Sequence, residues 1–158
     1  MGLEIERKYL VDKKIWDKII KDEKHLIKQG YILNNPDKTI RVRLTDNKGF
    51  ITIKGLSTGA SRKEFEYQIP EKDAKELLDN FCTAGISKIR NKISYKGKLW
   101  EVDEFLDDNA GLIVAEIELS MEQETFDLPD WIAKEVTGES KYYNSNLSRH
   151  PYKDWKQI

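Results

Sequence analysis

The chain has 158 residues, of which 35% are charged, yet its formal net charge is only -1. This length predicts one domain, over residues 1–158, with a core of its own. The balanced charge argues against a general nucleic-acid coat, which would need a basic excess. One cysteine rules out an internal disulfide framework and a cysteine zinc site. Because no apolar run could span a bilayer and no signal-peptide pattern is present, we expect a cytoplasmic protein without membrane contacts.

Strand-like alternation dominates the chain, with helical periodicity in three places. The predicted elements, in chain order, are a strand over 3–10, a helix over 12–20, strands over 25–33, 39–45, 50–54 and 61–69, a helix over 71–82, strands over 86–95, 99–105 and 112–120, and a short helix over 130–136. Asp12 is the expected N-cap of the first helix, and Gly138 is expected to end the last one. We expect the tail from Lys141 to be irregular.

Short hairpin loops join most of these strands, so the sheet is expected to be antiparallel. Closing the sheet on itself removes unpaired edges, and an eight-stranded barrel has room inside for side chains or one small ligand. The expected fold class is therefore α+β: an eight-stranded antiparallel closed β-barrel, a tunnel with a charged lumen and with helices packed outside. A homodimer is also expected, because two helices leave part of the apolar outer surface uncovered.

The charged residues of each predicted strand share one face. Glu4, Glu6 and Lys8 alternate with apolar neighbours, as do Arg41 and Arg43 further along the chain. Across all strands the bases on this face are Lys8, Arg41, Arg43, Lys54, Arg62, Lys88 and Arg90, and the acids are Glu4, Glu6, Glu64, Glu66, Glu101, Asp103, Glu116 and Glu118. Because removing ions from water costs several kcal/mol each, stability alone is a poor reason for such faces. They predict a highly charged ligand.

The residue types indicate which ligand this is. Arginines two apart on a strand can hold adjacent phosphate oxygens with bidentate forks, and lysines add mobile point charges. Carboxylates beside a phosphate group make sense if they hold a hard divalent cation, typically Mg²⁺ or Mn²⁺. Together these groups are the parts expected for phosphoryl transfer.

Seven segments resemble, in order, the strand signatures of the CYTH superfamily, the triphosphate tunnel metalloenzymes. They are Glu4-Ile5-Glu6-Arg7-Lys8, Arg41-Val42-Arg43, Thr52-Ile53-Lys54-Gly55, Arg62-Lys63-Glu64-Phe65-Glu66, Lys88-Ile89-Arg90, Trp100-Glu101-Val102-Asp103 and Glu116-Ile117-Glu118. The resemblance implies a tunnel that binds a linear triphosphate, either free or as the tail of a nucleotide or thiamine ester. It also implies hydrolysis or transfer that depends on Mg²⁺ or Mn²⁺.

Residue roles follow from the same resemblance. The implied phosphate-binding residues are Lys8, Arg41, Arg43, Lys54, Arg62, Lys88 and Arg90. The implied metal ligands are Glu4, Glu6, Glu116 and Glu118, with Asp103 or Glu64. Lys8 would pair with Tyr31 near the tunnel mouth, and these two would act in catalysis with Glu4 and Glu6. One metal would bridge phosphate oxygens, and a second would polarise the attacking water. A short helix carrying Trp131 and Lys134 would plug one tunnel end.

The preferred function is hydrolysis of inorganic triphosphate to pyrophosphate and phosphate. The expected partner is this small molecule, with no nucleic acid. Three alternatives remain open: a thiamine or nucleoside triphosphatase, a class IV adenylate cyclase, and a non-catalytic polyphosphate- or nucleotide-binding module. A cyclase would need an adenine pocket, and the sequence identifies none. The intact acidic pairs Glu4/Glu6 and Glu116/Glu118 speak against a module that only binds.

Overall fold

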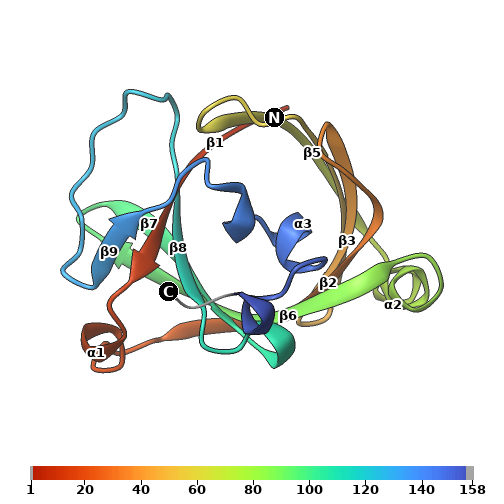
Figure 1. Ribbon diagram of the computed structural model, residues 1–158, viewed down its shortest axis with the longest axis horizontal. Coiled ribbons are helices and arrows are strands. Elements are labelled where there is room, and N and C mark those ends of the chain that lie inside the picture. The colour runs from red at the N-terminus through yellow and green to blue at the C-terminus, as the bar shows by residue number, and fades with distance from the viewer. Residues whose placement is uncertain (1, 156–158) are drawn as a thin grey trace.

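The computed structural model describes residues 2–155, which form a closed antiparallel β-barrel (Figure 1). Its strands are β1 (Leu3–Val11), β2 (Glu23–Asn35), β3 (Lys38–Thr45), β4 (Lys48–Gly55), β5 (Ser61–Ile69), β6 (Thr83–Tyr95), β7 (Lys98–Phe105), β8 (Ile113–Glu118) and β9 (Ile132–Glu135). The order around the ring is β1-β8-β7-β6-β2-β3-β4-β5, and antiparallel pairing of β5 with the first residues of β1 closes it. The predicted eight-stranded barrel is confirmed.

Two of the helices pack outside the barrel (Figure 1). They are α1 (Lys13–Trp16) and α2 (Glu71–Asn80), and α2 contacts β2, β3 and β4. Asp12 caps α1 as predicted, since its Oδ1 accepts from the backbone amides of Lys14 (3.1 Å) and Ile15 (3.3 Å). Both helices are shorter than predicted. The carbonyl oxygen of Trp16 accepts from the Ile19 amide at 3.0 Å and from the Lys21 ammonium at 2.7 Å, a tight turn that ends α1.

The predicted helix over 130–136 is wrong. These residues form β9, which pairs with the end of β1 through Tyr9↔Glu135 and Val11↔Ile132. Tertiary contacts outweigh the local pattern here, because Glu135 makes a bidentate ion pair with Arg7 at 2.8 and 2.9 Å. Gly138 is left-handed (φ +79°), but it follows a strand and not a helix. The segment carrying Trp131 and Lys134 therefore lies on the outside of the barrel and does not plug it.

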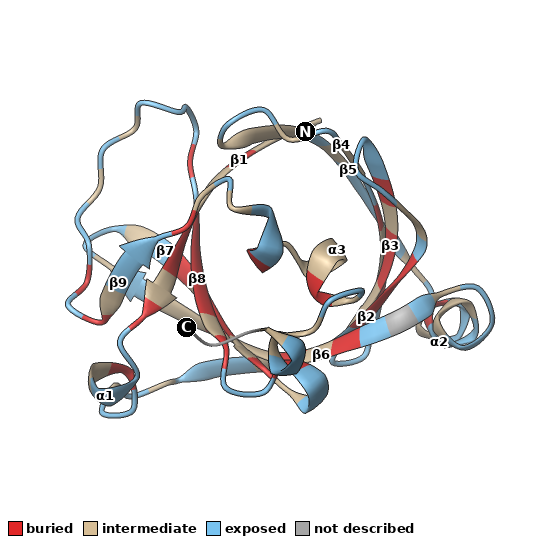
Figure 2. Ribbon diagram, in the orientation of Figure 1, coloured by how far each residue is buried: buried red, intermediate tan, exposed pale blue. Residues whose placement is uncertain are grey.

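An aromatic cluster outside the barrel forms the larger apolar core. It joins the outward-facing residues of β1, β7 and β8 to α1 and to the segment before β9. Trp100 packs edge-to-face against Tyr9 (5.6 Å between ring centroids) and Trp131 (5.9 Å), and Trp131 packs against Trp16 (5.1 Å). Burying each such side chain contributes ~1.5–3 kcal/mol. Figure 2 shows the buried residues along β7 and β8.

The tail is less irregular than predicted, and a second apolar cluster lies between it and the barrel. After β9 the chain forms the short helix α3 (Asn144–Leu147) and the 3-10 turns η2 (Ser140–Tyr142) and η3 (Tyr152–Asp154); a further turn, η1 (Asp107–Asn109), joins β7 to β8. Tyr142 and Leu147 of the tail pack against Ile86, Phe105 and Val114. These three barrel residues lie on the lumen face, because they pair with the lumen residues Gln29, Lys88 and Asp103. One end of the lumen is therefore filled with apolar side chains. Among the described residues, no helix has the length and apolarity needed to cross a membrane.

Candidate functional site

The charged faces meet inside the barrel, around a cavity of about 230 Å³. Its lining residues are Glu4, Glu6, Lys8, Arg41, Arg43, Lys54, Glu64, Glu66, Lys88, Arg90, Glu101, Glu116, Glu118 and Asn144. Arg62 and Tyr31 line an adjoining cavity that shares Lys8, Arg41 and Lys54 with the first. Asp103 lies in the wall, fully buried. The structure thus brings the residues that were singled out from strand parity into one enclosed space.

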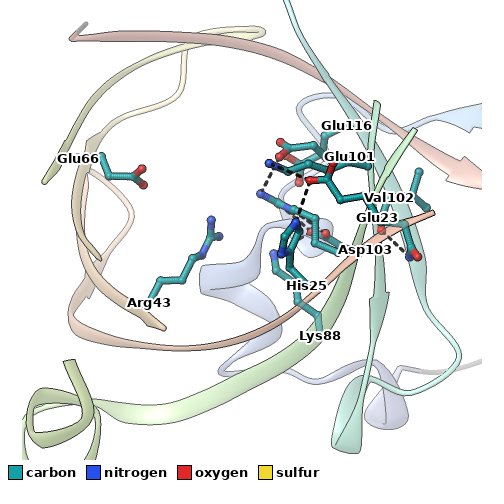
Figure 3. A network of polar contacts seen from close by, with 12 residues as sticks. Glu23, His25, Arg43, Glu66, Lys88, Glu101, Val102, Asp103 and Glu116 are labelled. Atoms are coloured by element: carbon teal, nitrogen blue, oxygen red, sulfur yellow. Dashed lines mark hydrogen bonds and ion pairs between the residues drawn. The ribbon is translucent and has the colours of Figure 1, made fainter. Parts of the chain in front are cut away.

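Strand register explains this convergence. Lys8 of β1 pairs with Glu116 of β8, and Arg90 of β6 pairs with Asp103 of β7. Paired residues in a sheet point to the same face. Figure 3 shows Arg43 and Glu66 reaching into the lumen from one wall, while Glu101, Asp103 and Glu116 lie at the opposite wall.

On the first wall, formed by β6 and β7, the Asp103 carboxylate contacts two cations, Lys88 and Arg90. Asp103 accepts a bidentate pair of hydrogen bonds from Arg90, at 2.8 and 2.9 Å, and lies 2.8 Å from the Lys88 ammonium. Burial by itself would raise the pKa of Asp103, but Arg90 and Lys88 outweigh it and bring that pKa to about 2. Burial also lowers the pKa of Lys88, to about 7, against the pull of Asp103. Both oxygens of Asp103 are occupied, so the geometry favours a role in holding these cations; direct metal binding by Asp103 stays a prediction.

The second wall carries the acidic pairs of β1 and β8. The Lys8 ammonium lies 3.0 Å from Glu116 and 3.2 Å from Glu6. Burial, followed by repulsion from Glu116, raises the pKa of Glu6 to about 7. Lys8 is thus shared by two carboxylates, and ionising both of them beside this one ammonium is unfavourable. Tyr31 lines the same cavity as Lys8, but the Lys8 ammonium bonds to these carboxylates, and the described contacts include no hydrogen bond between Lys8 and Tyr31.

On the third wall, formed by β4 and β5, acids and bases largely compensate one another. Lys54 lies 3.0 Å from Glu4 and 3.3 Å from Glu64. The Arg62 Nε donates to the carbonyl oxygen of Gly55 at 3.0 Å, and its guanidinium carbon lies 6.0 Å from the centre of the Tyr143 ring.

The two lumen arginines of β3 differ in their partners, since Arg41 has one long ion pair and Arg43 has none among the described residues. Arg41 donates to Thr52 at 3.1 Å and lies 3.5 Å from Glu66, yet its Nε is buried without a hydrogen-bond partner. Arg43 donates to the side-chain oxygen of Gln29 at 2.9 Å and has no ion pair among the described residues. Burial, with Arg41 and then Arg90 nearby, lowers the pKa of Arg43. An unpartnered buried donor is costly, so this wall is suited to an anion.

The acids of the second wall have the donor chemistry for a hard divalent cation. Glu118 makes no ion pair among the described residues, and burial, then Glu4 and Glu101, raises its pKa. Carboxylate oxygens are the ligands that Mg²⁺ and Mn²⁺ prefer. In the described part of the chain no three acidic, histidine or cysteine side chains already converge on one point. These carboxylates are suitable ligands for a cation, although Glu4, Glu6 and Glu116 each form an ion pair with a lysine here.

Two amides in this site, the buried Gln29 and the half-buried Asn144, have no role in the predictions from the sequence. Gln29 lies on β2, opposite Arg43, and its side chain bonds both to Arg43 and to Asn144 of α3. The parity of β2 could have placed Gln29 in the lumen. No strand pattern could have placed Asn144 there, because it belongs to the tail.

Comparison with known proteins agrees with this geometry. The sequence profile of the CYTH domain matches residues 2–152. The chain is 48% identical to an inorganic triphosphatase from Acetivibrio thermocellus, over 99% of this chain and 100% of that protein. It resembles the crystal structure of the inorganic triphosphatase NE1496 with a TM-score of 0.64 and 28% identity, covering 92% of this chain and 93% of the other.

A more distant structure, the PH1012 protein from Pyrococcus horikoshii, shares the fold with a TM-score of 0.60 at 21% identity, over 76% of this chain and 81% of that one. The profile match spans nearly the whole chain and includes all the strands that build the charged lumen. The chain belongs to the CYTH domain family.

Proposed function

We propose that this protein hydrolyses linear inorganic triphosphate to pyrophosphate and phosphate, using Mg²⁺ or Mn²⁺ held in the barrel lumen. The observation that carries the proposal is the separation of uncompensated charge across one cavity. Among the described residues, Arg43 on the β3 wall makes no ion pair, and neither does Glu118 on the β1–β8 wall, and both line the same cavity. A triphosphate that carries a divalent cation is complementary to this arrangement, because its phosphates can face the arginines while its cation faces the carboxylates.

Phosphate binding follows from the donors that the lumen leaves free. The two terminal nitrogens of Arg43 have no described partner, and the Nε of Arg41 has none either. Guanidinium groups suit this task, because their planar donors match adjacent phosphate oxygens. Arg62, Lys54, Lys88, Arg90 and Lys8 would complete the cradle around the chain of phosphates.

The acidic wall makes a cation necessary. The lumen set contains eight carboxylates against seven bases, so a polyanion alone would gain little from entering. We propose Glu4, Glu6, Glu116 and Glu118 as the metal-holding residues, with Glu64 at their edge. The bound cation would supply Lewis-acid stabilisation of the phosphates and lower the pKa of the attacking water. Lys8, held between Glu6 and Glu116, would keep these carboxylates oriented.

A second candidate, hydrolysis of a nucleoside or thiamine triphosphate, rests on a cavity at the end of the lumen away from the apolar cluster. This cavity, of about 460 Å³, is lined by His25 and Phe50 and shares Arg43 and Arg90 with the central cavity. An organic group joined to the triphosphate could lie there while its phosphates occupy the lumen.

The deciding experiment measures phosphate release from tripolyphosphate, ATP and thiamine triphosphate, each with Mg²⁺, Mn²⁺ or EDTA, beside a cyclic-AMP readout. We expect tripolyphosphate to give the highest kcat/KM and EDTA to abolish turnover. Faster release from ATP or thiamine triphosphate would favour the second candidate. Cyclic AMP formed faster than phosphate would make the protein a cyclase, and tight binding without turnover would make it a binding module.

A further inference from the structure

Two kinds of group orient cations in the lumen: carboxylates, which neutralise the cation, and neutral amides, which do not. Lys54, Lys8 and Arg90 are held by carboxylates. Arg43 is held by the neutral amide of Gln29, and the Lys88 ammonium bonds to the neutral amide of Asn144 as well as to Asp103.

Gln29 and Asn144 form one connected unit. Gln29, only 1% exposed, accepts from the Arg43 Nε at 2.9 Å and donates to the Asn144 Oδ1 at 3.3 Å. The same Asn144 oxygen accepts from the Lys88 ammonium at 2.9 Å. The chain of bonds thus links Arg43 on β3 to Lys88 on β6 through two amides, one on β2 and one on α3.

This arrangement determines which donors face a ligand. An arginine has one Nε donor and a fork of terminal nitrogens. With Nε bonded to Gln29, the fork of Arg43 remains free in the cavity. A lysine has three donors, and Asn144 and Asp103 each take one from Lys88, so one remains. An amide oxygen achieves this without cancelling the charge, whereas a carboxylate in the same place would compete with phosphate.

We propose that Gln29 and Asn144 are positioning residues that aim Arg43 and Lys88 at the substrate phosphates without adding negative charge beside either cation. The inference rests on the proposed function, since it needs a polyphosphate ligand in the lumen. It also gives the tail a part in the site, because α3 lies within the ring of strands (Figure 1) and its first residue, Asn144, lines the central cavity.

The test compares amide and carboxylate variants of the same shape. Asn144→Asp and Gln29→Glu keep an acceptor oxygen but add a negative charge, and Asn144→Ala removes the acceptor. The charge-matched control is Asn146→Asp on the same helix, because the Asn146 amide bonds to the carbonyl oxygen of Ser140 and does not line the cavity. KM and kcat for tripolyphosphate are measured with the cation that supports the faster wild-type turnover, and thermal melts monitor folding.

We expect Asn144→Asp to raise KM at least about tenfold, the size of one charge-assisted bond, and more than Asn144→Ala does. Gln29→Glu should behave like Asn144→Asp, and Asn146→Asp should change KM less than about twofold. A purely structural role would make the isosteric Asn144→Asp milder than Asn144→Ala. That order, or equal KM values for Asn144→Asp and Asn146→Asp, would overturn the inference while leaving the proposed function intact. If Gln29→Glu does not fold, the Asn144 series decides alone. A wild-type protein that neither binds nor cleaves tripolyphosphate would overturn both.

Discussion

Replacing Asp103 by asparagine should lower the free energy of unfolding more than neutralising any other carboxylate of the lumen. Its side chain is 1% exposed and serves two cations at once, Lys88 at 2.8 Å and Arg90 at 2.8 Å. Asparagine can keep one acceptor oxygen, but it leaves the buried cations without their counter-charge. Breaking a buried ion pair by removing one partner costs about 3–5 kcal/mol.

We therefore expect Asp103→Asn to lower the free energy of unfolding by about 3 kcal/mol, the low end of that range, because one hydrogen bond survives. For a chain of this size the loss corresponds to a fall in Tm of ~6–12 °C. Urea denaturation followed by circular dichroism gives the free energy, and thermal melts give Tm. Both are measured in EDTA so that no bound cation contributes.

The matched control is Glu101→Gln, which removes the other carboxylate near Arg90. The Glu101 side chain is 30% exposed and lies 3.5 Å from the Arg90 Nη1. Because partly solvated pairs contribute only about 0–1 kcal/mol, Glu101→Gln should change stability by less than ~1 kcal/mol. Equal losses from the two variants, or a loss below ~1 kcal/mol for Asp103→Asn, would refute the view that Asp103 is the buried counter-charge of this wall.

Three further variants test the rest of the site. Glu118→Ala should leave Tm in EDTA unchanged, because the residue makes no ion pair among the described residues. It should reduce turnover by orders of magnitude and weaken the rise in Tm on adding Mg²⁺ or Mn²⁺. Near-normal rates would remove Glu118 from the metal site. Arg41→Ala should raise KM for tripolyphosphate about tenfold or more, since a charge-assisted phosphate contact is lost; an unchanged KM and kcat would place Arg41 outside the phosphate cradle. The pKa of His25 is raised by hydrogen bonds with Glu23 and Asp46, so its contribution to stability is complete below about pH 6.5 and is lost as pH rises through the folded pKa. His25→Gln should then lower Tm more at about pH 5.5 than at about pH 8.5, and an equal effect at both would contradict the paired, protonated state.

Strand parity made most of the fold and lumen predictable from the amino-acid sequence. Side chains two apart on a strand must share a face, so Glu4 and Glu6, or Arg41 and Arg43, could not be separated by any tertiary arrangement of intact strands. Hairpin-length loops make the sheet antiparallel, and closing it into a barrel pairs the backbone groups that an open edge would leave exposed. The same constraint fixed which residues lie outside, and Trp100 packs there as the alternation requires.

Strand parity could predict neither the fold of residues 130–136 nor the position of Asn144, because tertiary contacts determine both. Residues 130–136 look helical locally, but pairing with β1 and the bond from Arg7 to Glu135 make them a strand. The position of Asn144 depends on how the tail packs against Phe105 and Val114 at the end of the barrel. Neither outcome has a periodic signature, because each is decided by contacts with strands that are not neighbours in the sequence.

The central claim is that function belongs to the inward-facing residues of the barrel and not to charge on its strands in general. Glu6 and Arg7 are neighbours on β1, but Glu6 lines the lumen and Arg7 pairs with Glu135 outside. The most direct measurement is therefore kcat/KM for tripolyphosphate, with Mg²⁺ or Mn²⁺, in Glu6→Gln and Arg7→Gln. We predict that Glu6→Gln loses orders of magnitude while Arg7→Gln stays close to wild type. Similar losses in both, or a loss confined to Arg7→Gln, would contradict the account.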